Sequence, residues 1–433
     1  MPDPDIAHGW ISSPDGRGTL DVIWSCTFTI VLCSWSVLCL NIPRRGKGYW
    51  KTLGHKSVWV IFTIVFPEVV TALAAEQWSS ARQSVADFKK SRFVQQDCMW
   101  SIKHAFFADM GGFMLREPPP NTSPAPRFKD IPIDAVQILW LAEKGYINWP
   151  NISEEQIRDK NKADGFARLL TVIQIVWFGV SCLGRAAQKL AISSLELGTI
   201  AYVFCTIPTF FFWSNKPLDA ETVEIVHATT SMAEILAQTG SKEATLYDLT
   251  PLDFINPPQG LSLLSLFWDG FGYPFLQNTT DKRPVETFPN RKATPPRGLS
   301  ALELAVGAFI GLGYTGIHVV GWNFHFPTDV ELLLWRISGC IIVGMVVVYL
   351  FVLAVITFGF KQIARALYGI DANVPNDLRS AVPASAQTAV FALASVLYTT
   401  ARLYIIIEAF TSLRAQPMGI YMTVEWNNFL PHF

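Results

Sequence analysis

Long apolar runs separated by polar stretches dominate the sequence. A helix needs roughly 20 apolar residues to cross the bilayer core. Seven runs approach that length, at residues 20–40, 58–78, 169–183, 195–213, 302–320, 334–358 and 388–410. The pattern predicts an all-α, polytopic transmembrane helical bundle with seven spans. An eighth run, 261–276, is shorter and contains Asp269, so it is either a further crossing or a re-entrant or interfacial helix.

Two large polar loops interrupt the runs. The predicted organisation, which treats each loop as one unit, is an extramembrane segment 1–19, spans one and two at 20–78, a loop with a proline-rich linker at 79–166, spans three and four at 167–213, a second loop at 214–299, spans five to seven at 300–410, and a tail at 411–433. Apolar residues at helical spacing predict a helix at 133–146 inside the first loop.

Basic residues suggest an orientation. The loop after the first run contains five Lys or Arg and no acid, so the positive-inside rule places it in the cytoplasm and the N-terminus in the lumen or outside the cell. The next loop is then lumenal, which agrees with glycosylation sequons at Asn121 and Asn151. The basic stretch 281–297 favours an eighth crossing, whereas a sequon at Asn278 favours seven, so both counts stay open.

Composition excludes several classes of protein. Of 433 residues, 50% are hydrophobic and only 16% are charged, against the roughly 25% charged residues of soluble domains. The net charge of -1 gives no electrostatic basis for nucleic-acid binding. The seven cysteines contain no CxxC pair, and no metal site is predicted. A GxGxxG pattern at 311–316 lies inside an apolar run, so with Gly307 it indicates a helix-packing face, and no cofactor is predicted.

Ionisable residues inside the runs are the main candidates for function. A charged side chain at the bilayer centre costs about 2.5–3.5 kcal/mol, which makes it a functional hypothesis by default. Glu68 follows Pro67 in the second run, where the proline is expected to kink the helix. His318 lies in the fifth run and Arg402 in the last. We expect Arg402 to pair with an acid, either Glu68 or Glu408.

Residues next to the runs are weaker candidates. Asp109, with His104, either lines a site at the membrane surface or ends a short helix. Lys216 follows the fourth run and is predicted to be a snorkelling anchor. Thr328, with Glu331 three residues later, fits a helix cap. Three tryptophans near run ends fit an interfacial belt, namely Trp213, Trp322 and Trp335.

Several segments together carry a resemblance to known sequences. They are Arg17-Gly-Thr-Leu-Asp21 with Trp24-Ser-Cys, residues 104–113, Trp213-Ser-Asn-Lys-Pro-Leu-Asp219, residues 322–336 and residues 402–414. The chain thereby resembles a large family of fungal multi-pass membrane proteins. Some members lie beside secondary-metabolite genes, so the resemblance implies a biosynthetic role, but it supplies no catalytic residues.

Three functions are compatible with these features. The first is an integral-membrane enzyme that performs cyclase- or isomerase-type acid–base chemistry on a lipophilic small molecule. Glu68 is then the candidate acid, with His318, Asp109 and Arg402 as further candidates. The second is a channel, transporter or receptor-like protein that uses the same buried charges. The third is a scaffold whose loops recruit partners. Besides the lipid bilayer and a lipophilic molecule, no partner is predicted.

Overall fold

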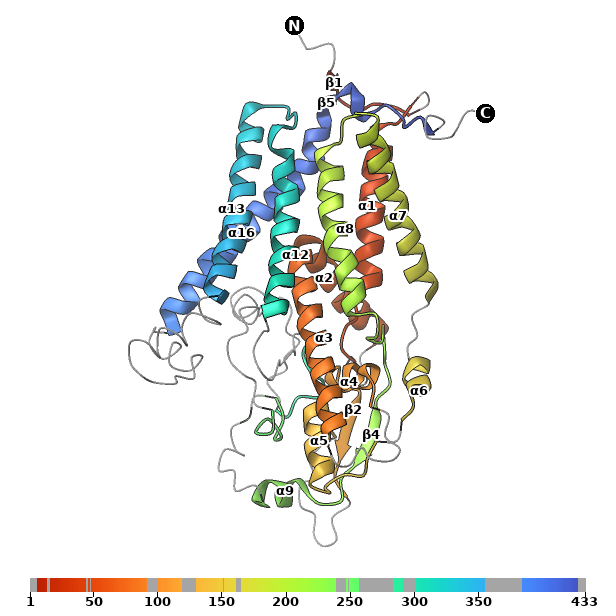
Figure 1. Cartoon of the computed structure of the whole chain (residues 1–433), viewed down its shortest axis with the longest axis vertical. Coiled ribbons are helices and arrows are strands. Elements are labelled where there is room, and N and C mark those ends of the chain that lie inside the picture. The colour runs from red at the N-terminus through yellow and green to blue at the C-terminus, as the bar shows by residue number, and fades with distance from the viewer. Residues whose placement is uncertain are drawn as a thin grey trace.

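The computed structural model divides into a bundle of long helices and a smaller mixed lobe at one end of it (Figure 1). The described residues are 6–426 except 14–15, 44–45, 47, 92–99, 119–129, 151, 161–164, 239–246, 248, 257–282, 291–300 and 355–383. The long bundle helices are α1 (Thr19–Val37), α7 (Gly165–Ala187), α8 (Ser194–Phe212), α12 (Ala301–Val320), α13 (Asp329–Ala354) and α16 (Ala384–Thr411).

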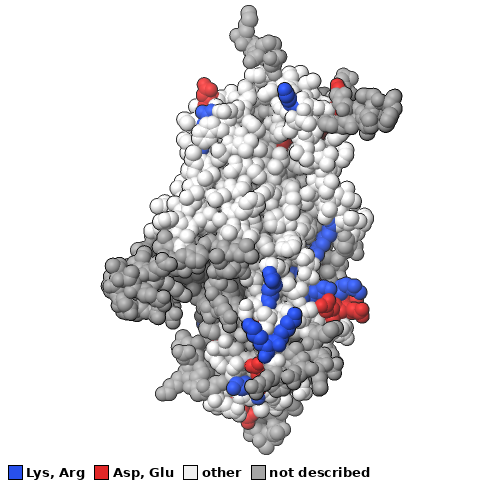
Figure 2. All heavy atoms as spheres, in the orientation of Figure 1, with Lys and Arg blue, Asp and Glu red and all other residues white. Residues whose placement is uncertain are grey.

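These six helices are each long and apolar enough to cross a membrane. A bent pair makes a seventh candidate if it is counted as one span. On the face seen in Figure 2, charged side chains gather over the lobe and at the far tip of the bundle, and a broad uncharged band separates them. The prediction of a multi-pass helical membrane protein is therefore confirmed.

The predicted second span is broken in the middle. It consists of α2 (Tyr49–Val65) and α3 (Pro67–Lys90), whose axes differ by 109°. Pro67 has no backbone N–H to donate and is the first residue of α3, where proline is well tolerated. The expected kink is thus a sharp reversal: α2 rises into the bundle, and α3 descends from the break into the lobe (Figure 1).

The two ends of the chain lie at the same end of the bundle (Figure 1). Strand β1 (Ile6–His8) pairs antiparallel with β5 (Ala415–Pro417). The Arg185 guanidinium on α7 donates to the carbonyl of Gly419 at 2.8 Å and to that of Ile420 at 2.9 Å. Segments that meet on one side of a membrane require an even number of crossings. Within the described part of the chain, the six long helices supply such a number if α2 and α3 enter and return.

The loop after α1 and the first large loop also share one end, which corrects the alternating orientation expected from the sequence. The Ile42 amide donates to the Met110 carbonyl at 3.2 Å, so these two loops are in direct contact. The basic residues of the first of these loops and the sequons of the second therefore cannot both be used to place the two loops on opposite sides of the membrane. The sequons at Asn121, Asn151 and Asn278 and the run 261–276 lie outside the described residues.

The lobe combines both large loops around a small sheet that the hydrophobic pattern did not predict. Strand β2 (Phe113–Arg116) pairs antiparallel with β3 (Ile131–Ile133) and parallel with β4 (Glu224–His227). Around it lie α4 (Ile102–Asp109), α5 (Ala135–Glu143), α6 (Glu154–Asp159) and α9 (Met232–Gln238). Helix α5 matches the helix expected at 133–146, and its N-terminus is capped by the Asp134 carboxylate, which accepts from the Gln137 amide at 2.8 Å.

Two of the three glycines of the GxGxxG pattern, Gly311 and Gly313, are packing positions, as expected, whereas Gly316 has nothing within 4 Å of its Cβ position. A Cβ on Gly313 would lie 2.6 Å from the Phe204 ring of α8, and one on Gly311 would lie 3.1 Å from Val346 of α13. Gly307 has nothing within 4 Å of its Cβ position, so it does not contribute to this face. Close helix approach explains the motif without a nucleotide.

Candidate functional site

Two helix ends meet inside the bundle at the break between α2 and α3. The last carbonyls of a helix lack partners and carry partial negative charge, whereas the first turn carries partial positive charge. The structure places a side chain of opposite charge at each end. Arg402 of α16 donates from Nε to the Val65 carbonyl of α2 at 3.2 Å. Glu68 lies in the first turn of α3.

Glu68 is held by a tyrosine from the last helix. The Tyr398 hydroxyl donates to Glu68 Oε1 at 2.6 Å, and the Tyr398 ring stacks with Phe66 at the break. The second carboxyl oxygen, Oε2, is buried and has no hydrogen-bond partner among the described residues. One oxygen is therefore held by a hydrogen bond, and the other is buried without one.

Arg402 joins the break to α12. Its Nη1 donates to His318 Nε2 at 3.3 Å, while His318 Nδ1 donates to the Tyr314 carbonyl at 3.0 Å. The imidazole is therefore neutral, with its proton on Nδ1, because an arginine nitrogen can only donate and a carbonyl oxygen can only accept. The guanidinium also lies 4.8 Å from the centre of the Tyr314 ring, a cation–π distance. We call Glu68, Tyr314, His318, Tyr398 and Arg402 the break cluster.

The break cluster brings together three of the four residues singled out in the sequence, but not with the expected pairing. No carboxylate of the described chain lies within ion-pair distance of Arg402, whose hydrogen-bond partners are a carbonyl and an imidazole. Glu408 instead accepts from the Thr411 hydroxyl at 3.1 Å, near the end of α16. Tyr398 and Tyr314 supply further contacts. Each precedes its partner, Arg402 or His318, by four residues and so lies on the same face of its helix.

Asp109 lies in the lobe, apart from the break cluster. As the last residue of α4, it accepts from the Ser80 hydroxyl at 3.2 Å and from the Ala135 amide at 3.4 Å. His104 uses both ring nitrogens, one with the Ser101 hydroxyl at 2.8 Å and the other with the Ile152 carbonyl at 2.8 Å. These contacts favour the second interpretation of Asp109, in which it ends a short helix.

Lys216 is buried, which corrects its interpretation as a snorkelling anchor. Only 3% of the residue is exposed. Its Nζ donates to Gln77 Oε1 at 2.7 Å and lies 3.5 Å from Asn41 Oδ1, over the Trp213 ring at 4.8 Å. Burial lowers the pKa of Lys216 to about 8, although the Cys39 thiol and the Asp109 carboxylate act in the opposite direction. This lysine lies where the bundle joins the lobe.

Replacing Lys216 with methionine is expected to raise the thermal unfolding midpoint at pH 7. The protein must desolvate a cation on folding, and a pKa lowered from 10.5 to about 8 corresponds to a penalty of about 3 kcal/mol. That penalty is complete below pH 8, where folded and unfolded chains both carry the proton, and it disappears as the pH rises to 10.5. The gain of K216M over the wild type should therefore shrink across that interval in intrinsic-fluorescence melts.

A matched control for that experiment is the exposed lysine at the end of α5. Lys144→Met should leave the midpoint nearly unchanged at every pH, because Lys144 is already in water. If K216M were less stable than the wild type at every pH, the hydrogen bond to Gln77 would outweigh the desolvation of the amine, and our account of this lysine would be wrong.

The predicted aromatic belt is also corrected. Trp213 and Trp335 are 2% and 1% exposed, and the Trp213 indole donates to Gln77 at 3.0 Å. Only Trp322, 38% exposed, fits an interfacial position. The predicted cap is present, since the Glu331 amide donates to the Thr328 hydroxyl at 3.3 Å, but the Glu331 carboxylate pairs with Arg414.

Comparison with known proteins gives a family but no activity. Within the described residues, no cluster of three or more His, Cys, Asp or Glu side chains is arranged to hold a metal ion. No curated protein and no solved structure matches the chain. The profile of DUF8562, a family of unknown function, matches residues 2–248 and 301–433. The chain therefore belongs to this family.

Proposed function

We propose that the protein is an integral-membrane enzyme that performs acid–base chemistry on a lipophilic small molecule at the break cluster. The observation that carries the proposal is the Glu68 carboxyl, with one oxygen held by Tyr398 and the other buried without a hydrogen-bond partner among the described residues. Buried polar atoms are normally hydrogen-bonded, so each exception calls for an explanation, of which a catalytic role is one. A carboxyl within a candidate membrane span also carries an energetic penalty, which makes it a functional hypothesis by default.

The neighbouring groups suit proton transfer to a substrate that carries little charge. Glu68 would donate its proton from Oε2 to a double bond or an ether oxygen of the substrate, and would take a proton back when the product forms, so the cycle needs no external acid. Tyr398 would orient the carboxyl through Oε1. An aromatic ring at the break, such as Phe66, would stabilise positive charge on the intermediate. This is cyclase- or isomerase-type chemistry, and it uses no nucleotide cofactor.

A second function, a proton or ion path, is favoured by the break itself. Discontinuous helices whose ends meet inside a membrane form the binding sites of many secondary transporters. The ends of α2 and α3 meet in this way, next to a carboxyl, a guanidinium and an imidazole. The enzyme remains our first choice because Arg402 already donates to the Val65 carbonyl at the end of α2, whereas Glu68 Oε2 has no hydrogen-bond partner among the described residues.

Deletion of the gene, followed by metabolite profiling, separates these two functions. The enzyme predicts that one compound disappears and a lipophilic precursor accumulates, and that purified protein in liposomes converts this precursor. An unchanged profile, together with proton or ion flux through protein-containing liposomes that empty liposomes lack, would instead establish the transport function. We also propose a role in fungal secondary metabolism, which the identity of the missing compound would test. Glycosylation of the sequons is a separate proposal, which a glycosidase-sensitive mobility shift would test.

A further inference from the structure

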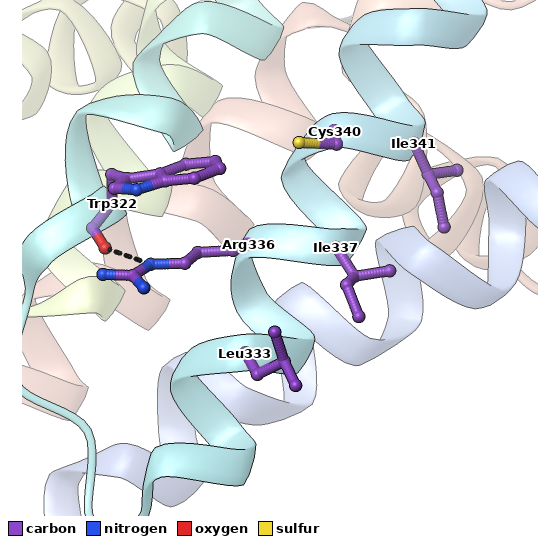
Figure 3. A pocket seen from close by; sticks show the side chains of 6 residues that line it. All are labelled: Trp322, Leu333, Arg336, Ile337, Cys340 and Ile341. Atoms are coloured by element: carbon purple, nitrogen blue, oxygen red, sulfur yellow. Dashed lines mark hydrogen bonds between the residues drawn. The ribbon is translucent and has the colours of Figure 1, made fainter.

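An open groove lies on the outer face of the bundle, away from the break cluster. It runs between α13 and the short helix η4 (Gly321–Asn323), with a volume of about 540 Å³ (Figure 3). Its lining consists of Trp322, Leu333, Arg336, Ile337, Cys340 and Ile341. All of these side chains except Arg336 are apolar, so the groove is an apolar surface with a single cation.

The apolar part of the groove is a helix face directed towards lipid. Leu333, Ile337 and Ile341 recur every four residues, which places them in one row along α13. Leu333 is 55% and Ile337 is 45% exposed. These residues belong to a candidate span, so the medium they meet is hydrocarbon rather than water. An acyl chain that lies along this row would meet only apolar side chains.

Arg336 places a positive charge beside that row without a matching acid. Its Nε donates to the Trp322 carbonyl at 2.9 Å, the hydrogen bond drawn in Figure 3. Its Nη2 donates to Asn323 Oδ1 at 3.2 Å. The guanidinium lies 5.3 Å from the centre of the Trp322 ring. Both hydrogen-bond acceptors are neutral, and no carboxylate of the described chain lies within 4 Å of it, so its charge is not compensated by this part of the protein.

The position of Arg336 along α13 corresponds to the level of lipid head groups. The helix begins with Asp329 and Glu331 in its first turn, which marks the water side. At 1.5 Å per residue, Arg336 lies roughly 10 Å below Asp329, and Ile341 lies roughly 7 Å deeper still. Trp322 beside it is half-exposed, as is typical of a tryptophan in the interfacial belt.

We propose that this groove binds an anionic glycerophospholipid, with one acyl chain along Leu333, Ile337 and Ile341 and the phosphate on Arg336. The two fixed hydrogen bonds orient the guanidinium and leave Nη1 for a phosphate oxygen, a charge-assisted contact that arginine forms well. One cation beside one apolar row is complementary to a phosphate group joined to an acyl chain. This favours a lipid over a second copy of the protein. The proposal is independent of the acid–base function of the break cluster.

Native mass spectrometry of the purified full-length protein tests the site. The probes are dioleoylphosphatidylserine and dioleoylphosphatidylcholine, each titrated into the delipidated protein. The wild type should retain phosphatidylserine preferentially. Arg336→Gln should weaken that binding by about tenfold, the loss expected for one hydrogen bond to a charged group. Ile337→Trp, which fills the groove and keeps the arginine, should weaken the binding of both lipids.

The matched control is Arg82→Gln, since Arg82 is an exposed arginine on α3 that also lies over a tryptophan ring, at 4.6 Å from Trp78. It should bind lipid as the wild type does. Equal binding of the two lipids by the wild type, or equal phosphatidylserine binding by wild type and R336Q, would overturn the proposal and leave ordinary annular lipid. A dimer that forms in detergent and is abolished by I337W would overturn it in favour of a second copy.

Discussion

Replacing Arg402 with methionine is expected to cause a large loss of stability. Arg402 is 3% exposed and supplies the hydrogen bonds received by the Val65 carbonyl and His318 Nε2. Without the guanidinium, both buried acceptors lose their donor, at a cost of about 1–3 kcal/mol each. The thermal unfolding midpoint of the purified protein, followed by tryptophan fluorescence, should fall accordingly. Arg82→Met, the exposed control, should change it little.

The same experiment measures whether Arg402 and Glu68 interact across the break. The guanidinium of Arg402 and the carboxyl of Glu68 interact electrostatically across the break, so we expect the effects of replacing them to be coupled. The double variant R402M/E68Q should therefore lose less stability than the sum of the two single losses, as expected for coupled residues. Strict additivity would show that the two side chains do not sense each other, and would contradict the described arrangement.

Glu68→Gln is expected to abolish product formation while the protein still accumulates in membranes. Glutamine keeps the size of the side chain and can still accept from the Tyr398 hydroxyl, so the cluster retains its shape. It cannot deliver a proton. General acid–base groups contribute about 10²–10⁴-fold to a rate, so conversion of the accumulated precursor should fall at least 100-fold. Measurements are made in liposomes that contain equal amounts of folded protein.

Two further variants define the role of Glu68. Tyr398→Phe removes the hydrogen bond that orients Glu68 and should reduce turnover less than E68Q does. Glu408→Gln is the matched control. Glu408 is a buried acid of α16 that lies outside the break cluster and accepts a hydrogen bond from Thr411. It should retain the activity of the wild type. If E68Q converted the precursor as fast as E408Q does, Glu68 would not be the proton donor.

The sequence predicted the existence of the break cluster better than its geometry. Charged residues inside apolar runs are rare enough to be informative one at a time, so Glu68, His318 and Arg402 could each be found without a structure. The proline before Glu68 likewise predicted a distortion at the right place. Which partners these residues choose depends on helices more than 80 residues apart in sequence, as the contact of His318 with Arg402 illustrates, and no local pattern encodes that choice.

The largest corrections also come from long-range contacts. An apolar run has the same composition whether it crosses the bilayer or enters and returns, so the reversal at Pro67 could not be deduced from hydropathy. Lys216 has the local sequence of an interfacial anchor, but its partner Gln77 is 139 residues away. The strands of the lobe have only three or four residues, too few to show an alternation of apolar and polar positions.

Photo-crosslinking from position 398 tests most directly the claim that the last helix meets the break between α2 and α3. Tyr398 is replaced with p-azidophenylalanine, which carries its reactive group where the hydroxyl donates to Glu68. After illumination of intact membranes, our account predicts that mass spectrometry finds the peptide of α16 joined to the start of α3, around Pro67 and Glu68. Adducts confined to lipid, or to helices other than α2 and α3, would contradict it.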